Sequence, residues 1–260
     1  MNKLSVVIIT LNEEDNIAKC LDSVKPVADE IVVVDSFSTD QTETICETYD
    51  SVKFIKNRFV NYGLQKQFAI EQASFNLILS IDADEYLSDE LTKEIHTIKG
   101  KELQYAGYFI RRKTIYLGKM LNFCGMNTEK HLRLFDKTKG AFNDAKVHEK
   151  FITDGKCTIL KHKFVHHPYR DLDHQQAKYN QYSTLFAEGK AGKKRCTRCK
   201  VVTKSFISFL LVYFVKFSFL DGYAGYVWSK MSAHYSFMKY AKLYEKNKTS
   251  IKTNTPAPAK

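Results

Sequence analysis

The sequence predicts an α/β fold with a doubly wound, mostly parallel sheet and helices on both of its faces. Leu4–Thr10 and Ile31–Asp35 are continuous apolar runs rich in β-branched residues, which is typical of strands buried on both faces of a parallel sheet. Between them, segment 17–24 has apolar residues at i, i+3, i+4 and i+7, the spacing of a helix packed on that sheet.

The alternation of strand and helix then continues along the chain. Asp40 is placed to cap a helix over residues 42–49, and residues 52–55 form a third strand. A helical segment over residues 64–73 leads to a fourth strand, Leu77–Ile81. Parallel strands joined by helices require right-handed crossovers, which is the doubly wound arrangement.

Length and composition limit the domain organisation. The chain has 260 residues, 44% of them apolar, which is enough for one large α/β domain with a C-terminal appendage and excludes wholesale disorder. We expect a catalytic domain over residues 1–190 and a basic, aromatic-rich helical region over residues 191–252. Residues 253–260, with two prolines and no apolar period, are expected to be a disordered tail.

The cysteines and the start of the chain predict a reducing, cytosolic location. The six cysteines are scattered, and Cys20 and Cys46 fall on apolar helix stripes as small buried side chains. Residues 1–10 lead directly into a strand, so we expect no secretory signal.

Charge is distributed unevenly. The net charge is +11, but residues 1–100 contain 9 Lys or Arg and 18 Asp or Glu, whereas residues 101–260 contain 31 and 11. The balance is therefore −9 in the first part and +20 in the second. This asymmetry indicates an acidic, metal-binding half and a half that meets polyanions, and it argues against a nucleic-acid partner.

Carboxylates follow three of the predicted strands, in the segments 12–14, 35–40 and 82–84. Ligands of doubly wound sheets bind beyond the carboxyl ends of the strands, so these loops should meet at one edge. Crowded carboxylates need a cation or hydrogen-bond donors, and oxygen ligands suit Mg²⁺ or Mn²⁺. Because no glycine-rich phosphate loop is present, we expect phosphate to be held through the metal.

Each acidic segment also has a simpler interpretation. Residues 12–14 could be an ordinary helix N-terminus, where acidic side chains favour the helix dipole. Asp35 ends a buried strand, where an unused carboxylate is costly, so a function is favoured. An isolated Asp-x-Asp is common, but Asp82-Ala83-Asp84 directly follows an apolar strand and is accompanied by the other two loops.

Several segments resemble a known family. Residues 5–24 (SVVIITLNEEDNIAKCLDSV), 29–42 (DEIVVVDSFSTDQT) and 77–91 (LILSIDADEYLSDEL) are similar to the N-terminal core of glycosyltransferase family 2, which has the Rossmann-like GT-A fold. The later segments resemble a narrower branch, the lipopolysaccharide-core β-glucosyltransferase-like enzymes; they are AGYFIRR, HLRLFD, FNDAKVHEKF and HHPYRDLDHQQAKYNQY. The chain departs from the branch at His131 and His167, which leaves the acceptor open.

The resemblance implies roles for the acidic loops. Asn12 and Glu14 would line the donor pocket, Asp35 would contact the base or ribose, and Asp82 would contact the ribose. Asp84 would bind the metal that bridges the diphosphate, and the donor would be a UDP-sugar, with UDP-glucose favoured.

The resemblance further implies inversion by direct displacement, with a carboxylate from the second half as the base. Glu149 is our first choice for the base and Asp144 the second. His166 is the candidate for the late histidine that GT-A enzymes supply to the metal or diphosphate. Arg133 either meets phosphate in the pocket or forms a surface salt bridge.

The C-terminal region predicts contact with a membrane. Seven basic and no acidic residues lie between positions 190 and 204, and the ten residues 206–215 are uncharged. Ten residues are too few for a spanning helix, so this segment and residues 223–244 are expected to be amphipathic helices on an anionic leaflet. The alternative is a helix in the protein core. We therefore expect a peripheral enzyme on the inner face of the cytoplasmic membrane, acting on a lipid-linked or lipopolysaccharide-type glycan.

Two other function classes remain as alternatives. A haloacid-dehalogenase-type phosphohydrolase also has an Asp-x-Asp after a buried strand, although normally after its first strand. A non-catalytic membrane-surface binding protein could use the basic half alone.

Overall fold

The computed structural model describes residues 2–143 and 149–253. The chain divides into two compact units. The first, called here the sheet unit, contains Met1–Lys113 and Thr128–His167, and the second, the helical unit, contains Thr114–Asn127 and Pro168–Lys260.

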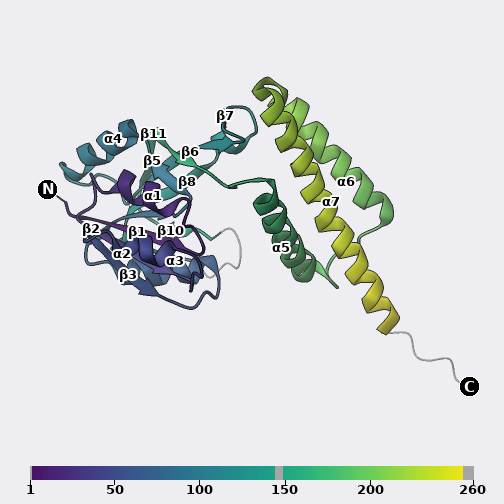
Figure 1. The fold of residues 1–260 in the computed structure, drawn as a ribbon, viewed down its shortest axis with the longest axis horizontal. Helices are drawn as coiled ribbons and strands as arrows, with labels where there is room; N and C mark the ends of the chain where they lie inside the picture. Colours follow the sequence, from purple (N-terminus) through teal and green to yellow (C-terminus); the bar gives the residue numbers. More distant parts are fainter. Residues whose placement is uncertain (1, 144–148, 254–260) are drawn as a thin grey trace, which may run out of the picture. The chain divides into compact units, whose positions relative to one another are not determined.

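The sheet unit alternates strands and helices in its first half and consists mainly of strands in its second (Figure 1). Its elements are β1 (Leu4–Thr10), α1 (Ile17–Val24), β2 (Glu30–Asp35), α2 (Thr42–Glu47), β3 (Val52–Lys56), α3 (Tyr62–Glu71), β4 (Leu77–Asp82), β5 (Glu85–Leu87), α4 (Asp89–Lys99), β6 (Gly107–Tyr116), β8 (Lys130–Asp136), η2 (Lys137–Lys139), β9 (Gly140–Phe142), β10 (Phe151–Thr153) and β11 (Cys157–His166). The last residues of β6 belong to the helical unit.

The main sheet has the strand order β3-β2-β1-β4-β8-β6-β11-β5, with β7 (Lys119–Leu121) paired to β6. Strands β3, β2, β1 and β4 are parallel, as the sequence predicts. The strands after β4 add antiparallel pairs, β4 with β8, β8 with β6, and β11 with β5. The sheet is therefore mixed and GT-A-like, with its parallel half formed by the first 82 residues.

Strands β1, β2 and β4 are buried on both faces because their side chains alternate between two apolar clusters. Val6 and Ile8 of β1 pack in one cluster with Leu21 of α1. Val7 packs in the other cluster with Ala69 of α3. A strand with a core on either side has no polar face, which explains the uninterrupted apolar runs in the sequence.

The helical unit contains three long helices, which lie side by side in Figure 1. Its elements are β7, η1 (Met126–Thr128), α5 (Leu172–Lys190), α6 (Arg198–Leu210), a π-helical turn η3 (Leu211–Val215), a 3₁₀ turn η4 (Ser218–Asp221) and α7 (Gly222–Thr253). Asp171 and Thr197 cap α5 and α6 by accepting backbone N–H groups of His174 and Lys200.

Buried polar contacts hold the turn between α6 and α7 in place. The carboxylate of Asp221 is buried and accepts the backbone N–H groups of Asn122 and Phe123, each over 2.9 Å. Gly225 of α7 approaches this turn so closely that a Cβ there would lie 1.8 Å from the carbonyl oxygen of Ser218. Only glycine fits at that contact.

The units do not divide where the sequence suggested. We expected a boundary after residue 190, whereas α5 packs with α7 and belongs to the helical unit. The expected interfacial segments, residues 206–215 and 223–244, are helical, in α6–η3 and α7. Thr253 is the last described residue of α7, and residues 254–260 of the predicted disordered tail lie outside the described residues.

Candidate active site

The predicted acidic loops meet at one edge of the sheet. In the parallel register, Thr10 of β1 is opposite Asp35 of β2, and Ile9 of β1 is opposite Asp82 of β4. The segments that follow these three strands therefore begin at the same level. This confirms the arrangement expected from a doubly wound sheet.

The loops after β1 and β2 are bonded to each other. The backbone N–H of Asn12 donates to Ser38 Oγ, and Asn12 Oδ1 accepts the N–H of Thr39, both over 2.8 Å. Glu14 Oε2 accepts the N–H of Gln41 over 2.9 Å. Asn12 also has a positive φ of 55°, which asparagine tolerates better than most residues. Asn12 and Glu14 thus fix the shape of this edge, and their contact with a donor remains a prediction.

Asp35 is completely buried and has its hydrogen bonds satisfied within its own loop. One carboxylate oxygen accepts the N–H of Ser38 over 2.8 Å and the other accepts the Ser38 hydroxyl. These bonds offset the cost of burying a charge at the end of a strand. Asp35 therefore holds the loop whose tip exposes Phe37, and the predicted contact of Asp35 with base or ribose stays a prediction.

Arg133 lies inside the sheet unit rather than in a surface salt bridge. Its side chain is 9% exposed, and its Nη2 lies 2.8 Å from Asp82 Oδ2 and 2.5 Å from Glu85 Oε1. Glu85 Oε2 also accepts the backbone N–H of Asp82 over 3.0 Å. Arg133 consequently neutralises two carboxylates, one at the end of β4 and one at the start of β5.

Lys66 of α3 connects this group to Glu149. Its Nζ, with a side chain 7% exposed, lies 3.0 Å from Asp82 Oδ1 and 2.9 Å from Glu149 Oε1. The two carboxylate oxygens are therefore no more than 5.9 Å apart, the sum of these distances. Glu149, predicted as the base, thus lies at the edge where the acidic loops meet. Asp144, the second candidate, lies outside the described residues.

The charges of this network are set by its neighbours. Burial alone would raise the pKa of Asp82, but Arg133 and Lys66 lower that pKa far below its usual range. Burial raises the pKa of Glu85, aided by the nearby carboxylates and opposed by Arg133. Burial also opposes the charge of Lys66, yet Asp82 and Glu149 raise the pKa of its ammonium. Asp82 and Lys66 are therefore a charged pair at neutral pH.

Asp84 and His166 lie together beside this network. Asp84 Oδ2 is 3.4 Å from His166 Nε2, with side chains 15% and 13% exposed. The pairing of β5 with β11 produces this contact, because His166 is opposite Glu85 in the register. The structure thus joins the two residues that we expected to bind the metal.

The site fits a cation that takes few protein ligands. Within residues 2–143 and 149–253, no group of three or more His, Cys, Asp or Glu side chains could hold a metal ion. Mg²⁺ typically takes one or two carboxylates and completes its shell with phosphate oxygens and water. Asp84 offers one such carboxylate, and His166 beside it has a buried Nδ1 without a hydrogen-bond partner.

Sequence reasoning missed Lys66 and Glu85. Lys66 lies on the buried stripe of α3 with Gly63 and Ile70, at the spacing i, i+3, i+7. A lysine on a buried stripe is a signal, because a buried ammonium needs a carboxylate partner. Glu85 directly follows the Asp-x-Asp, on the inward side of β5 with Leu87.

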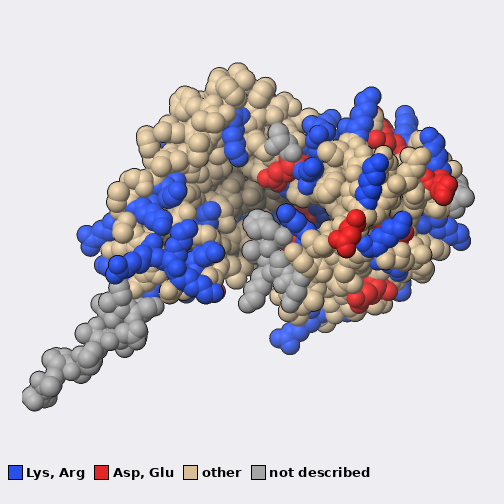
Figure 2. All heavy atoms as spheres, turned by 180° about the vertical axis from the view of Figure 1, so that it is seen from behind, with Lys and Arg blue, Asp and Glu red and all other residues tan. Residues whose placement is uncertain are grey.

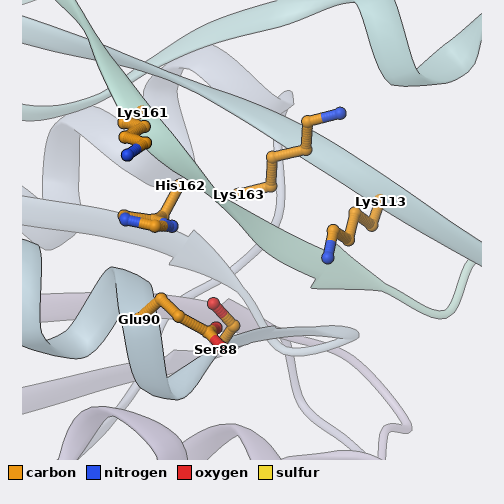
Figure 3. A pocket seen from close by; sticks show the side chains of 6 residues that line it. All are labelled: Ser88, Glu90, Lys113, Lys161, His162 and Lys163. Carbon is orange, nitrogen blue, oxygen red and sulfur yellow. The ribbon is translucent and has the colours of Figure 1, made fainter.

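A separate hollow of about 350 Å³ lies along β11, before His166 (Figure 3). Its lining residues are Ser88, Glu90, Lys113, Lys161, His162 and Lys163. The volume is in the range of small-ligand sites, but the lining is charged instead of apolar. None of the predicted donor, metal or base residues lines it.

Open α/β sheets bind their ligands beyond the carboxyl ends of their strands, and the charged cluster of this chain lies at that edge. The chain belongs to glycosyltransferase family 2: the family model "Glycosyl transferase family 2" matches residues 5–163. It is therefore a glycosyltransferase, and the phosphohydrolase and the non-catalytic binding protein find no support.

Curated relatives extend the similarity over nearly the whole chain. The "Lipopolysaccharide core biosynthesis glycosyltransferase LpsC" of Rhizobium meliloti (strain 1021) is 32% identical over 259 residues, which cover 96% of this chain and 95% of that protein. The "Uncharacterized glycosyltransferase RT0209" of Rickettsia typhi is 34% identical, covering 94% of this chain and 88% of that protein.

A similar solved structure is that of S. aureus TarS 1-349 in complex with UDP-GlcNAc. It has a TM-score of 0.48 and 15% sequence identity, and the similarity covers 98% of this chain and 93% of that chain.

Proposed function

We propose that this enzyme is an inverting, metal-dependent transferase that moves glucose from UDP-glucose to a membrane-associated glycan of the lipopolysaccharide-core type. The acceptor class follows the name of the relative LpsC, which matches along almost its full length. The observation on which the proposal depends most is the placement of Glu149 within 5.9 Å of Asp82, at the strand edge that also presents Asp84.

The donor side is assigned to the loops after β1, β2 and β4. Asn12, Glu14 and Asp35 shape the loop pair that receives the uridine. Asp82 stays ionised between Lys66 and Arg133 and accepts hydrogen bonds from the ribose. The role of Arg133 toward phosphate is indirect, because its Nη2 is engaged by Asp82 and Glu85.

Asp84 and His166 are assigned to the divalent cation, Mg²⁺ or Mn²⁺. A bound cation supplies charge neutralisation for the departing diphosphate. Asp84 Oδ2 and His166 Nε2, which lie 3.4 Å apart, would bind this cation.

Glu149 is assigned as the base. Its carboxylate takes the proton of the acceptor hydroxyl while that oxygen attacks the anomeric carbon and the bond to the diphosphate breaks. Lys66 orients the carboxylate from the protein side, and the side chain of Glu149 is 15% exposed, so an acceptor can reach it.

The proposal also places the enzyme on the inner face of the cytoplasmic membrane, where a nucleotide-sugar from the cytosol and a lipid-linked glycan are both accessible. The charge asymmetry of the sequence supports this location, since the second part of the chain is strongly basic.

Single-turnover transfer from UDP-glucose to a lipopolysaccharide-core glycan, with Mn²⁺ present, tests the assignment. Glu149→Gln should lower the transfer rate by about 10²–10⁴, the usual cost of losing a general base. Affinity for UDP-glucose should stay unchanged, and proton NMR of the wild-type product should show a β-linked sugar.

Glu102→Gln is the matched control, because Glu102 is an exposed carboxylate of the same unit. It should leave transfer unaltered. Loss of donor affinity in Glu149→Gln would place this residue in the donor pocket instead, and an α-linked product would exclude inversion.

A further inference from the structure

Helix α6 contacts α7 through the buried Val201, which packs with Leu243, and through small polar side chains. Ser205 and Ser208 donate hydrogen bonds to the carbonyl oxygens of Ala233 and Ser232 in α7, over 2.9 and 3.3 Å. Ser229 of α7 is also completely buried. In water, a helix normally buries its apolar side and exposes its serines. Helices in lipid instead meet through small residues and side-chain hydrogen bonds.

The opposite side of α6 and η3 is apolar and exposed. Six large apolar side chains on it are between 44% and 66% exposed; they are Val202, Phe206, Ile207, Leu211, Phe214 and Val215. Most of them are spaced three or four residues apart, so they form one continuous stripe, called here the α6 apolar face. The following turn adds Phe217 and Leu220, and Tyr223 is 77% exposed. An exposed apolar patch of this kind marks an interaction site.

The charges around the α6 apolar face indicate what covers it. Residues 190–220 contain eight Lys or Arg and no Asp or Glu. The next acidic residue, Asp221, is buried, and its carboxylate accepts backbone N–H groups. Figure 2 shows Lys and Arg gathered over one part of the helical unit, while another part of the same unit is largely uncharged. Two copies of such a surface would repel each other, whereas an anionic lipid leaflet attracts it.

The lengths of the helices determine how a bilayer can be entered. No single helix in the described part of the chain is long and apolar enough to cross a membrane. The segments Arg198–Val215 and Ser218–Lys248 have the length and apolar composition of a membrane span only when taken together. The chain bends by 70° between them. A bent pair that enters and leaves on the same side needs no complete span.

We infer that the α6 apolar face and the turn after it insert into one leaflet of an anionic bilayer, so that the enzyme is held by apolar insertion as well as by charge. This deepens the membrane-bound part of the proposed function, but its test uses no transfer reaction. A failure of the inference is therefore distinguishable from a failure of the catalytic proposal.

Sedimentation of the full chain with vesicles of phosphatidylglycerol and phosphatidylethanolamine provides the first test. Raising the salt from about 0.1 M to about 1 M shortens the Debye length from about 10 Å to about 3 Å and screens surface charge. Inserted apolar side chains are not screened, so the bound fraction should fall by no more than about three-fold.

The second test removes the apolar face while leaving all charges in place. The triple variant Phe206→Ser, Leu211→Ser and Phe214→Ser should lower vesicle affinity by at least about ten-fold, because about three buried apolar side chains are lost. The three positions are exposed, so unfolding temperature and UDP affinity should stay unchanged.

The matched control substitutes three exposed apolar residues of the sheet unit, as Val60→Ser, Ile152→Ser and Ile159→Ser. It should bind vesicles as the wild type does. Complete release of the wild type at high salt, or full binding by the triple variant, would overturn the inference. The inference would also fail if the wild type did not bind vesicles but formed a dimer, and if the triple variant were monomeric. The α6 apolar face would then bind a second copy of the chain.

Discussion

Replacing Lys66 by methionine removes one ammonium from between two carboxylates. Methionine keeps the length of the aliphatic stem, so packing of the 7% exposed side chain is largely preserved. Asp82 retains Arg133 at 2.8 Å, but Glu149 loses its ion-pair partner at 2.9 Å. The variant therefore isolates the cost of an unpaired carboxylate at the site.

Breaking a buried ion pair by removing one partner costs about 3–5 kcal/mol. Glu149 is 15% exposed and Asp82 keeps a second cation, so we expect the lower end, about 3 kcal/mol. In a unit of this size, 1 kcal/mol corresponds to about 2–4 °C, so the melting temperature should fall by roughly 6–12 °C. Calorimetry of the full chain, with urea unfolding followed by circular dichroism, measures both quantities.

A double variant identifies the cause. Adding Glu149→Gln to Lys66→Met removes the unpaired charge and should recover about half or more of the lost stability, since residues in contact are not additive. Lys56→Met is the control, because Lys56 pairs with Glu43 at 2.6 Å on the surface, where such pairs contribute little. A Lys66→Met protein as stable as the wild type, or a double variant less stable than both single variants, would refute the reasoning.

Two further predictions concern the metal and acid stability. Asp84→Asn should abolish the Mn²⁺ dependence of UDP binding by calorimetry without changing the unfolding temperature; unchanged metal-dependent affinity would remove Asp84 from the cation site. Burial, with Arg133 and Arg112 nearby, lowers the pKa of His131 to about 3, so the unfolded chain binds a proton between about pH 3 and the usual value of about 6.5 while the folded chain does not. The free energy of unfolding should therefore fall as the pH drops through this range. His131→Gln should lessen that fall by on the order of 1 kcal/mol at pH 4.5, allowing for a side chain 35% exposed. Equal acid sensitivity of the two proteins in urea unfolding would contradict this prediction.

The parallel half of the fold is predictable because its signal is strong and local. β1 and β2 are uninterrupted apolar runs, and α1 has its four buried residues at helical spacing. The rule that strand ends gather ligands then places Asp35 and Asp82 at one edge without any knowledge of side-chain positions. The later strands were harder to predict, since β6 and β11 mix exposed and buried positions along their length.

The partners of the charges could not be predicted in the same way. Arg133 and Asp82 are 51 residues apart, and Lys66 and Glu149 are 83 residues apart. Such pairs depend on which strands lie beside each other and in which register, and several acidic residues could satisfy each cation equally well in the sequence alone. Arg133 was therefore equally compatible with phosphate contact and with a surface salt bridge until the fold placed it.

Helix α6 shows a second limit of sequence patterns. Its apolar period is the same whether the apolar side faces a protein core or a lipid. Within the helical unit, Ser205 and Ser208 face α7 and Phe206 is 63% exposed, so this apolar side is not packed inside the unit. The direction of the helix face, and not its composition, is the observation on which the inferred membrane insertion depends.

The choice of base can be argued from the network itself. Asp82 is too acidic to take a proton, because Arg133 and Lys66 lower its pKa. Glu85 has a raised pKa, but its side chain is 2% exposed and bonded to Arg133, so an acceptor hydroxyl cannot reach it.

Asp84 contacts His166 and is the carboxylate proposed for the cation. With Asp82, Glu85 and Asp84 set aside, Glu149, whose side chain is 15% exposed, is the carboxylate that remains among the described members of this cluster. Lys66 therefore has two tasks that a single variant can separate. In the proposed mechanism it keeps Asp82 charged for the donor and holds Glu149 beside the acceptor, so transfer in Lys66→Met should fall further than donor affinity does.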